Sequence, residues 1–248
     1  MRKCLEKSKH YILNSNMNMK RGFDMKTGKC KAKLICLDGL DGAGKKTVAK
    51  KLFAQLSSKG KLVKSVSFPM YDKWHSIFVK LYLKGFFGKD PIKINPYVAS
   101  MFYAIDRFLG YRKYIKPYLN TYDYILLDRY TTSNMIFQAA KGRDIPDMMN
   151  IMNFIIALEY KMLKIKNPDY VFILDTNIEQ TIKNISNRNN KKDIHETIEF
   201  QELVDDSLYL GLHRFNWIII DTLDNSNTLR LPTEIASEII KKIEGVIA

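Results

Sequence analysis

The sequence has few cysteines and no long hydrophobic run. Its 248 residues include only three cysteines, Cys4, Cys30 and Cys36. They form no CxxC pair and have no histidine ligand set nearby, which excludes a disulfide scaffold and argues against a structural zinc site. Hydrophobic runs such as Ile155–Leu158 are far too short to cross a bilayer. We therefore expect a cytoplasmic protein with reduced thiols and no membrane partner.

Acidic residues are also scarce, because 40 Lys and Arg stand against 26 Asp and Glu, for a net charge of +14. Residues 1–33 hold ten Lys and Arg against Glu6 and Asp24, a net charge of +8 that leaves +6 for the other 215 residues. A body so mildly basic gives little support to a nucleic-acid partner. We expect a disordered basic extension over residues 1–30 and a folded domain over residues 31–248. A targeting segment, or a start codon near Met25, remains an alternative for the extension.

Glycine is sparse too, with 12 in the chain, yet three of them lie in the segment Leu34–Thr47, LICLDGLDGAGKKT. Gly39, Gly44 and Lys45 have the GxxxxGK spacing of a phosphate-binding loop. In such a loop, backbone N–H groups surround the phosphates at a helix N-terminus and the lysine adds a positive charge. The motif predicts nucleotide binding by Gly39, Leu40, Asp41, Gly42, Ala43, Gly44, Lys45, Lys46 and Thr47.

Apolar runs alternate with helical patterns along the rest of the chain, which is typical of an α/β fold with a parallel sheet. The expected strands are Lys33–Asp38, Leu62–Phe68, Tyr124–Asp128, Tyr170–Asp175 and Trp217–Asp221. Helices are expected after the phosphate-binding loop and over Asn95–Leu119, Ile145–Leu163, Ile178–Arg188, Thr197–Arg214 and Pro232–Ile247. We predict the three-layer α/β/α fold of a P-loop NTPase with a five-stranded parallel sheet, in which strand-end carboxylates lie beside the phosphate-binding loop.

Four further segments, taken together with this loop, form a set of motifs that indicates a family. They are FPMYD (Phe68–Asp72), YAIDR (Tyr103–Arg107), DRYTTSN (Asp128–Asn134) and KKDIHE (Lys191–Glu196). In this order, from Leu34 to the C-terminus, the set resembles the thymidylate kinase family, most closely its bacterial thymidylate-kinase-like subgroup. The resemblance implies a kinase that uses ATP and Mg²⁺ to convert dTMP into dTDP for dTTP biosynthesis. It also implies a homodimer, for which the apolar helix Ile145–Leu163 is a candidate interface, unless that helix belongs to the core.

The same resemblance implies roles for four catalytic residues. Lys45 would bind the donor phosphates, and Arg129 would hold the acceptor phosphate near them. Asp128 would support Mg²⁺ as the metal-binding residue. Arg188 lies in the polar segment Asn187–Glu196, which is expected to be a short mobile lid that excludes water, and it would meet the phosphates when the lid closes.

For the acceptor, the resemblance implies a pocket that binds the sugar and the base. Asp41 would reach the sugar 3′-hydroxyl, and Tyr103 would stack on the base. Arg107 and Asn134 would contact the polar edge of the base. The expected substrate-binding residues are Asp41, Phe68, Tyr71, Tyr103, Arg107, Arg129, Ser133 and Asn134.

Two positions depart from the pattern. Lys46 stands where a phosphate-binding loop has the Ser or Thr that binds Mg²⁺, and the hydroxyl follows one residue later at Thr47. We expect the Lys46 side chain to turn away from the metal. Met70 stands where much of the family has an arginine that contacts the acceptor phosphate, which leaves Arg129 as the main anchor.

Other functions are consistent with part of these observations. A deoxynucleoside kinase would act on the free nucleoside, but it needs a base after the second strand, where we find only FPMYD. A nucleotide-binding protein could have lost activity through Lys46 and Met70. The basic N-terminal residues could bind nucleic acid.

Overall fold

The centre of the fold is a five-stranded sheet in which all neighbouring strands are parallel. The strands are β1 (Lys33–Asp38), β2 (Val63–Ser67), β3 (Tyr124–Asp128), β4 (Tyr170–Asp175) and β5 (Ile218–Asp221), in the order β2-β3-β1-β4-β5. All five expected strands are confirmed, with β2 and β5 slightly shorter than predicted. This computed structural model describes residues 31–186, 194–195, 197–224 and 226–245. The predicted extension over residues 1–30 lies outside the described residues.

The register of the central strands brings the carboxyl ends of β1 and β3 together. Leu37 on β1 pairs with Asp128 on β3, and Asp38 pairs with Ile173 on β4. The backbone N–H of Arg129 then donates to the carbonyl of Leu37 at 3.0 Å. The segment after β1 and the residues after β3 therefore start from the same edge of the sheet.

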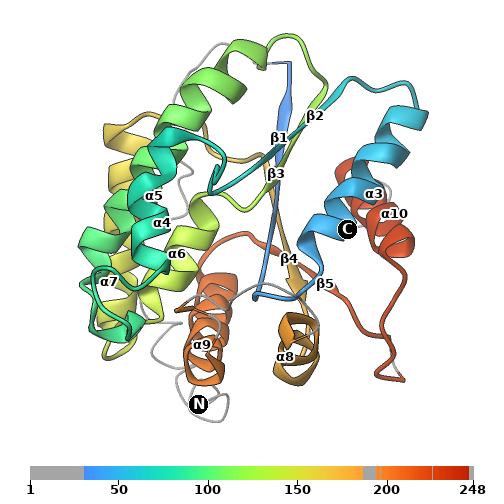
Figure 1. Ribbon diagram of the computed structural model, residues 1–248. Helices are drawn as coiled ribbons and strands as arrows, with labels where there is room; N and C mark the ends of the chain where they lie inside the picture. The colour runs from blue at the N-terminus through green and yellow to red at the C-terminus, as the bar shows by residue number, and fades with distance from the viewer. Residues whose placement is uncertain (1–30, 187–193, 196, 225, 246–248) are drawn as a thin grey trace. The chain divides into compact units, whose positions relative to one another are not determined.

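Helices cover both faces of the sheet, as the predicted three-layer fold requires (Figure 1). On one face lie α3 (Lys45–Ser58) and α10 (Pro232–Ile243). On the other lie α4 (Ile77–Leu83), α5 (Pro96–Gly110), α6 (Thr131–Ala139), α7 (Ile145–Ile156) and α9 (Ile198–Arg214). A shorter helix, α8 (Ile178–Ser186), follows β4. Among the described residues, no helix combines the length and hydrophobicity that a membrane span requires.

The first face is closed by apolar side chains at helical spacing. Leu52 and Leu56 of α3 are fully buried and pack with Ile235 and Ile239 of α10 against the sheet. Burying four such side chains contributes roughly 6–12 kcal/mol of transfer free energy before the entropy cost of folding. This packing fixes the start of α3, where the phosphate-binding loop ends.

The second face is closed by α6 and α7. Met148, Ile151, Met152 and Ile155 of α7 are all buried, in a cluster with Met135 of α6. The chain continues past α7 as a π-helical segment, η5 (Ala157–Met162), so the predicted helix Ile145–Leu163 is confirmed with a change of pitch. Its buried apolar side chains belong to the core.

The start of α5 is set by its sequence. The Asn95 side chain accepts hydrogen bonds from the N–H groups of Tyr97 and Val98, and Pro96 occupies the first helical position. After Gly110 the helix becomes a π segment over Tyr111–Ile115. The predicted helix over Asn95–Leu119 is therefore regular only in its first part.

Two helices were not predicted from the sequence. In α4, Val79 and Tyr82 are buried against α5, so its conformation depends on a tertiary contact as well as local propensity. In α6, buried polar residues interrupt the apolar stripe by which a helix is recognised. At the C-terminal end, α10 stops at Ile243 rather than Ile247.

Candidate active site

The loop between β1 and α3 has the geometry of a phosphate cradle. Gly39, Gly42 and Gly44 have φ values of +135°, +87° and +82°. A Cβ at Gly39 would lie 2.6 Å from the carbonyl oxygen of Leu174, so only glycine fits there. Gly44 is the N-cap of α3, and no side chain in the described part of the chain caps this helix. The first N–H groups of α3 are thus available to an anion.

Lys45, the first residue of α3, is buried beneath the loop. Its Nζ donates to the carbonyl oxygens of Leu40 at 2.6 Å and Gly39 at 3.0 Å. Burial and the nearby Arg129 guanidinium lower the pKa of Lys45 to about 8. At neutral pH the ammonium is therefore still charged, as binding of a polyphosphate requires.

The next two residues of α3 differ from Lys45 in their surroundings. Lys46 and Thr47 are both exposed, although the backbone of each remains in the first turn of α3. The Lys46 ammonium is thus directed to solvent and away from the buried Lys45.

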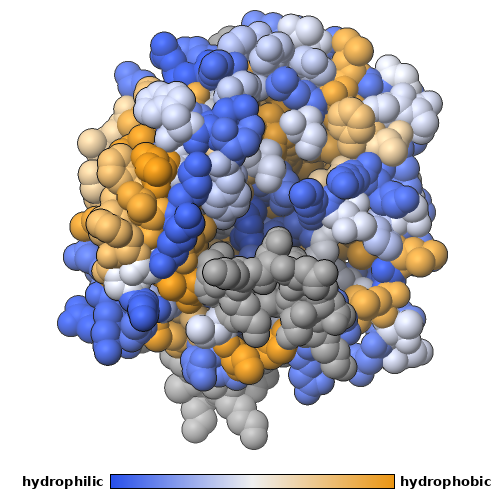
Figure 2. All heavy atoms as spheres, viewed as in Figure 1, coloured by the Kyte–Doolittle hydropathy of each residue, from blue (hydrophilic) through white to orange (hydrophobic). Residues whose placement is uncertain are grey.

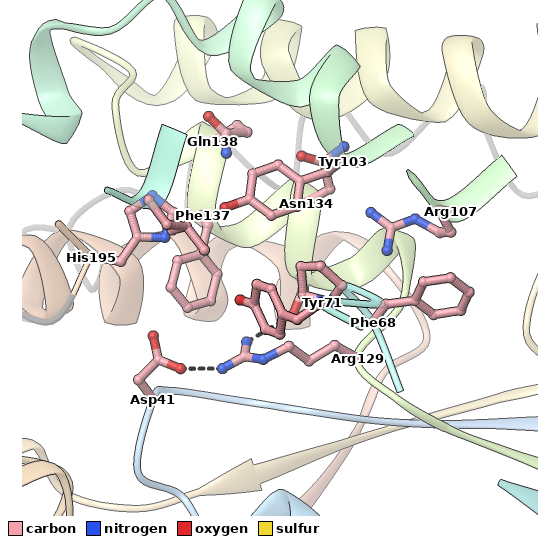
Figure 3. Close-up of a pocket in the computed structure, with 13 residues that line it drawn as sticks. Asp41, Phe68, Tyr71, Tyr103, Arg107, Arg129, Asn134, Phe137, Gln138 and His195 are labelled. Atoms are coloured by element: carbon pink, nitrogen blue, oxygen red, sulfur yellow. Dashed lines mark hydrogen bonds and ion pairs between the residues drawn. The ribbon is translucent and has the colours of Figure 1, made fainter. Parts of the chain in front are cut away.

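A pocket lies beside this loop (Figure 3). Aromatic, apolar and charged side chains line it together, as is usual for small-molecule sites. All eight predicted substrate-binding residues line it: Asp41, Phe68, Tyr71, Tyr103, Arg107, Arg129, Ser133 and Asn134. The structure also adds residues that were not in the predicted set: Pro69, Leu83, Phe137, Gln138 and His195.

Arg129 connects the pocket to the phosphate-binding loop. It follows β3 with a left-handed backbone (φ 65°), which is uncommon for a residue other than glycine. Its guanidinium forms an ion pair with Asp41 and donates to Ser133 Oγ at 3.0 Å (Figure 3). Burial by itself would lower the pKa of Arg129, but Asp41 and Asp38 raise it overall, so the group stays charged.

Two carboxylates end the central strands beside Arg129. Asp38 is fully buried, accepts from Ser133 Oγ at 2.7 Å, and keeps its Oδ2 without a partner among the described residues. Burial raises the pKa of Asp38, and Arg129 and Lys45 oppose this. Asp128 is partly exposed and accepts from Ser67 Oγ at 3.1 Å.

These carboxylates are compatible with Mg²⁺ that is bound chiefly through a substrate. Among the described residues, no three His, Cys, Asp or Glu side chains form a metal-binding cluster. Mg²⁺ in kinases keeps several waters and binds through phosphates with one or two carboxylates. The single accessible carboxylate of Asp128 fits that requirement.

The opposite end of the pocket holds Tyr103, Arg107 and Asn134. The Arg107 guanidinium is 5.6 Å from the Phe68 ring centroid and equally far from that of Tyr130. Arg107 also forms an ion pair with Glu159 at 2.6 Å, and Asn134 Nδ2 donates to the same carboxylate at 2.9 Å. Charged and polar groups thus meet aromatic rings at this end, an arrangement suited to a heterocyclic base.

Comparison with known proteins identifies the family. The family described as Thymidylate kinase matches residues 37–230. This chain belongs to the thymidylate kinase family. It is 30% identical over 182 residues to a probable thymidylate kinase of Thermococcus kodakarensis, covering 72% of this chain and 82% of the relative. It is also 30% identical over 176 residues to a thymidylate kinase of Brachyspira hyodysenteriae, covering 71% and 78%.

A solved structure supports the fold of a thymidylate kinase independently. The structure of thymidylate kinase from Candida albicans superposes with a TM-score of 0.66 and 21% identity, covering 88% of this chain and 93% of that chain. At this identity the likeness establishes the fold. With the family match, it confirms the predicted P-loop architecture and an ATP-dependent phosphotransferase of the thymidylate kinase family.

A supporting residue behind the pocket, Glu159, was also missed by the sequence-based prediction. Glu159 is fully buried in η5 and contacts Arg107, Thr131 and Asn134. A signal was present in the sequence, because Glu159 is a lone acid in the apolar stretch FIIALEYKML. A buried carboxylate in such a stretch needs partners, which here are the predicted base-binding residues.

His195 is the second addition from the KKDIHE segment. Its Nε2 lies 2.8 Å from Tyr82 Oη, which in turn accepts from Lys141 Nζ at 2.9 Å. Burial and the charge of Lys141 lower the pKa of His195 to about 3. The imidazole is therefore neutral at pH 7.

The remaining predicted residues stand apart from the pocket. Met70 does not line it; its backbone N–H donates to Asp106 Oδ2 at 3.1 Å. Arg188, like most of the predicted lid Asn187–Glu196, lies outside the described residues. Arg129 is thus the predicted phosphate anchor that the structure places in the pocket.

Proposed function

We propose that this protein transfers the γ-phosphoryl group of ATP to the 5′-phosphate of dTMP, giving dTDP and ADP. The position of Arg129 carries the proposal, because one guanidinium lines the pocket and pairs with Asp41 of the phosphate-binding loop. A fixed guanidinium fork suits two phosphates that must approach each other.

On the donor side, the first turn of α3 and Lys45 would hold the β- and γ-phosphates. Lys45 would exchange the carbonyl oxygens of Gly39 and Leu40 for phosphate oxygens, which are stronger acceptors. Its charge would stabilise the loose transition state of phosphoryl transfer. Asp128 would hold Mg²⁺ directly or through water, and the metal would neutralise charge on the phosphates.

On the acceptor side, Tyr103 would stack on the base and Phe68 and Tyr71 would border the sugar. Asp41 would accept from the 3′-hydroxyl once the acceptor phosphate draws Arg129 toward itself. No general base is needed, since an acceptor phosphate oxygen is already ionised at neutral pH.

A coupled ADP-release assay tests the proposal with ATP, Mg²⁺ and a panel of dTMP, dUMP, dCMP, dGMP and thymidine. We expect turnover with dTMP and none with thymidine. Turnover with thymidine but not dTMP would instead identify a deoxynucleoside kinase. ATP binding without turnover of any acceptor would show that the protein only binds nucleotide.

We further propose that the protein acts as a cytoplasmic homodimer that pairs through α4 and α5. Val98, Met101 and Ile105 recur at helical spacing on α5 and are exposed, beside the exposed Phe78 of α4. Figure 2 shows hydrophobic side chains gathered on the side of the molecule where α4 and α5 lie. Contiguous exposed apolar surface commonly marks an interface.

Sedimentation equilibrium tests the dimer. We expect twice the chain mass for the wild type and the chain mass for Met101→Glu, which would bury a charge in the interface. A wild type that remains a single chain at micromolar concentration would disprove the pairing.

A further inference from the structure

The carboxylate of Glu159 organises the end of the pocket where the base would bind. Its Oε2 accepts from Arg107 Nε at 2.6 Å and from Thr131 Oγ1 at 2.8 Å. Its Oε1 accepts from Asn134 Nδ2 at 2.9 Å and from Arg107 Nη2 at 3.4 Å. A single buried side chain therefore engages residues of α5 and of α6 at once.

These contacts determine which way the Asn134 amide points. Its Nδ2 lies between Glu159 Oε1 and the carbonyl oxygen of Ser100, at 2.9 and 3.0 Å. Both neighbours can only accept hydrogen bonds, so the NH₂ group must occupy this position. The Asn134 Oδ1 atom is buried with no hydrogen-bond partner in the described structure, although Asn134 lines the pocket. An acceptor is thus reserved for a ligand.

Arg107 supplies the opposite polarity. Glu159 occupies its Nε and Nη2, and a guanidinium has further N–H donors and no acceptor. Both residues line the pocket, which therefore offers a donor from Arg107 and an acceptor from Asn134. Thymine and uracil present an acceptor at O4 and a donor at N3–H, whereas cytosine presents a donor at N4 and an acceptor at N3. The polarity matches thymine and uracil and opposes cytosine.

We propose that Glu159 is the positioning residue that sets this preference, because it locks the Asn134 amide with its oxygen toward the base. The inference rests on the proposed kinase function and goes beyond it to the origin of base choice. Glu159 does not touch the substrate in this scheme; it acts through Asn134.

Glutamine at this position would release the fixed orientation of the Asn134 amide. The Arg107 Nε–H and the Thr131 hydroxyl both lie within 2.8 Å of Oε2, so they would claim the single amide oxygen. The new NH₂ group would then face the Asn134 NH₂ group, donor against donor, while the Ser100 carbonyl would still accept from Asn134. Each orientation of the Asn134 amide would then have one matched and one mismatched neighbour, so NH₂ would face the base in part of the molecules. That arrangement would accommodate N3 of cytosine.

The decisive experiment compares kcat/KM for dTMP, dUMP and dCMP in the wild type and in Glu159→Gln. We expect the dTMP/dCMP ratio to fall at least tenfold, since discrimination by a mismatched polar pair is large. The dTMP/dUMP ratio should stay within about twofold, because these bases share the same polar edge. A general loosening of the pocket would move both ratios, and that result would overturn the proposal.

Two further variants make the test independent of the folding of Glu159→Gln. Asn134→Ala should lower the dTMP/dCMP ratio on its own, and an unchanged ratio there would also overturn the proposal. Thr131→Val removes a donor to Oε2 without touching Asn134, so the ratio should persist even if the melting temperature falls. If the wild type phosphorylates no pyrimidine nucleotide, the proposed function fails. If it phosphorylates dTMP and dCMP equally well, this inference alone fails.

Discussion

The phosphate-binding loop and the acceptor pocket are built in different ways. The loop is a short contiguous segment, Gly39–Thr47, whose function depends on glycine backbone angles and the start of one helix. The pocket is lined by residues spread from Asp41 to His195 and depends on buried side chains that support one another. A site made of backbone is specified locally by its sequence motif. A site made of side chains also needs a supporting layer that no local motif describes.

Charge is distributed in keeping with this difference. In the loop, the buried Lys45 ammonium rests on backbone carbonyl oxygens until a phosphate replaces them. In the pocket, the Arg107 guanidinium is already neutralised by Glu159. The loop therefore retains charge for its ligand, whereas the pocket retains hydrogen-bonding polarity. The substitutions that follow probe this contrast.

Removing the loop ammonium should have the largest effect. Lys45→Ala should lower kcat by about 10³-fold, because a preorganised charge on the transferring group is lost. Its melting temperature should change little, since the substitution removes a buried cation that bonds to no carboxylate among the described residues. The matched control Lys50→Ala takes an exposed lysine from the same helix and should keep full activity. A small kcat effect at Lys45 would mean that the loop does not hold the transferring phosphoryl group.

Replacing a loop glycine by alanine should lower the free energy of unfolding by an amount that depends on the position. Gly39→Ala should lower the free energy of unfolding by about 3 kcal/mol, because φ of +135° is strained and the new Cβ meets the Leu174 carbonyl. Gly44→Ala, at φ of +82° with no atom within 4 Å of its Cβ, should cost only about 1 kcal/mol. Urea unfolding measures both. Equal costs would show that the close approach of the backbone at Gly39 is unimportant.

Behind the pocket, the buried Lys141 should lower the stability of the fold by a smaller amount that depends on pH. Burial lowers its pKa from the ordinary lysine value to about 7, so the unfolded chain holds this proton more tightly. Stability should be lowest below pH 7 and should rise between pH 7 and about 10. Lys141→Met should remove this rise. After allowing for the lost hydrogen bonds, the free energy of unfolding should increase by about 1–2 kcal/mol at pH 6, and the increase should be smaller at pH 9.

Unfolding curves at pH 6 and pH 9 measure this difference. Lys84→Met, which changes an exposed lysine, serves as the control and should show no such pH dependence. Parallel pH profiles for the wild type and Lys141→Met would show that the buried amine remains solvated.

How much the sequence predicts follows the same division. The five strands and the helix start at Asn95 were predicted correctly, because apolar runs and helix capping are local signals. The helix α6 was missed because its buried face contains Thr131, Asn134 and Gln138, which look polar until their partners are known.

The candidate site shows the limit more sharply. Motif residues such as Arg107 and Asn134 were predicted and do line the pocket. Glu159 was not predicted, because its importance depends on contacts with residues 25 and 52 positions away. His195 was not predicted to line the pocket, although it lies in the pocket wall as a neutral ring. The role of a supporting residue depends on its packing contacts, which spacing in the sequence cannot show.

Arg129 lies where the two regions meet, and its left-handed backbone keeps it there. If each substrate redirects the same guanidinium, the two binding equilibria are linked. Breaking the ion pair between Arg129 and Asp41 costs free energy. Once the first substrate has broken it, the second substrate binds without that cost. By thermodynamic reciprocity, the factor by which ATP changes the affinity for the acceptor equals the factor by which the acceptor changes the affinity for ATP. Through this single ion pair, binding at the phosphate-binding loop changes the affinity of the acceptor pocket, and the reverse also holds.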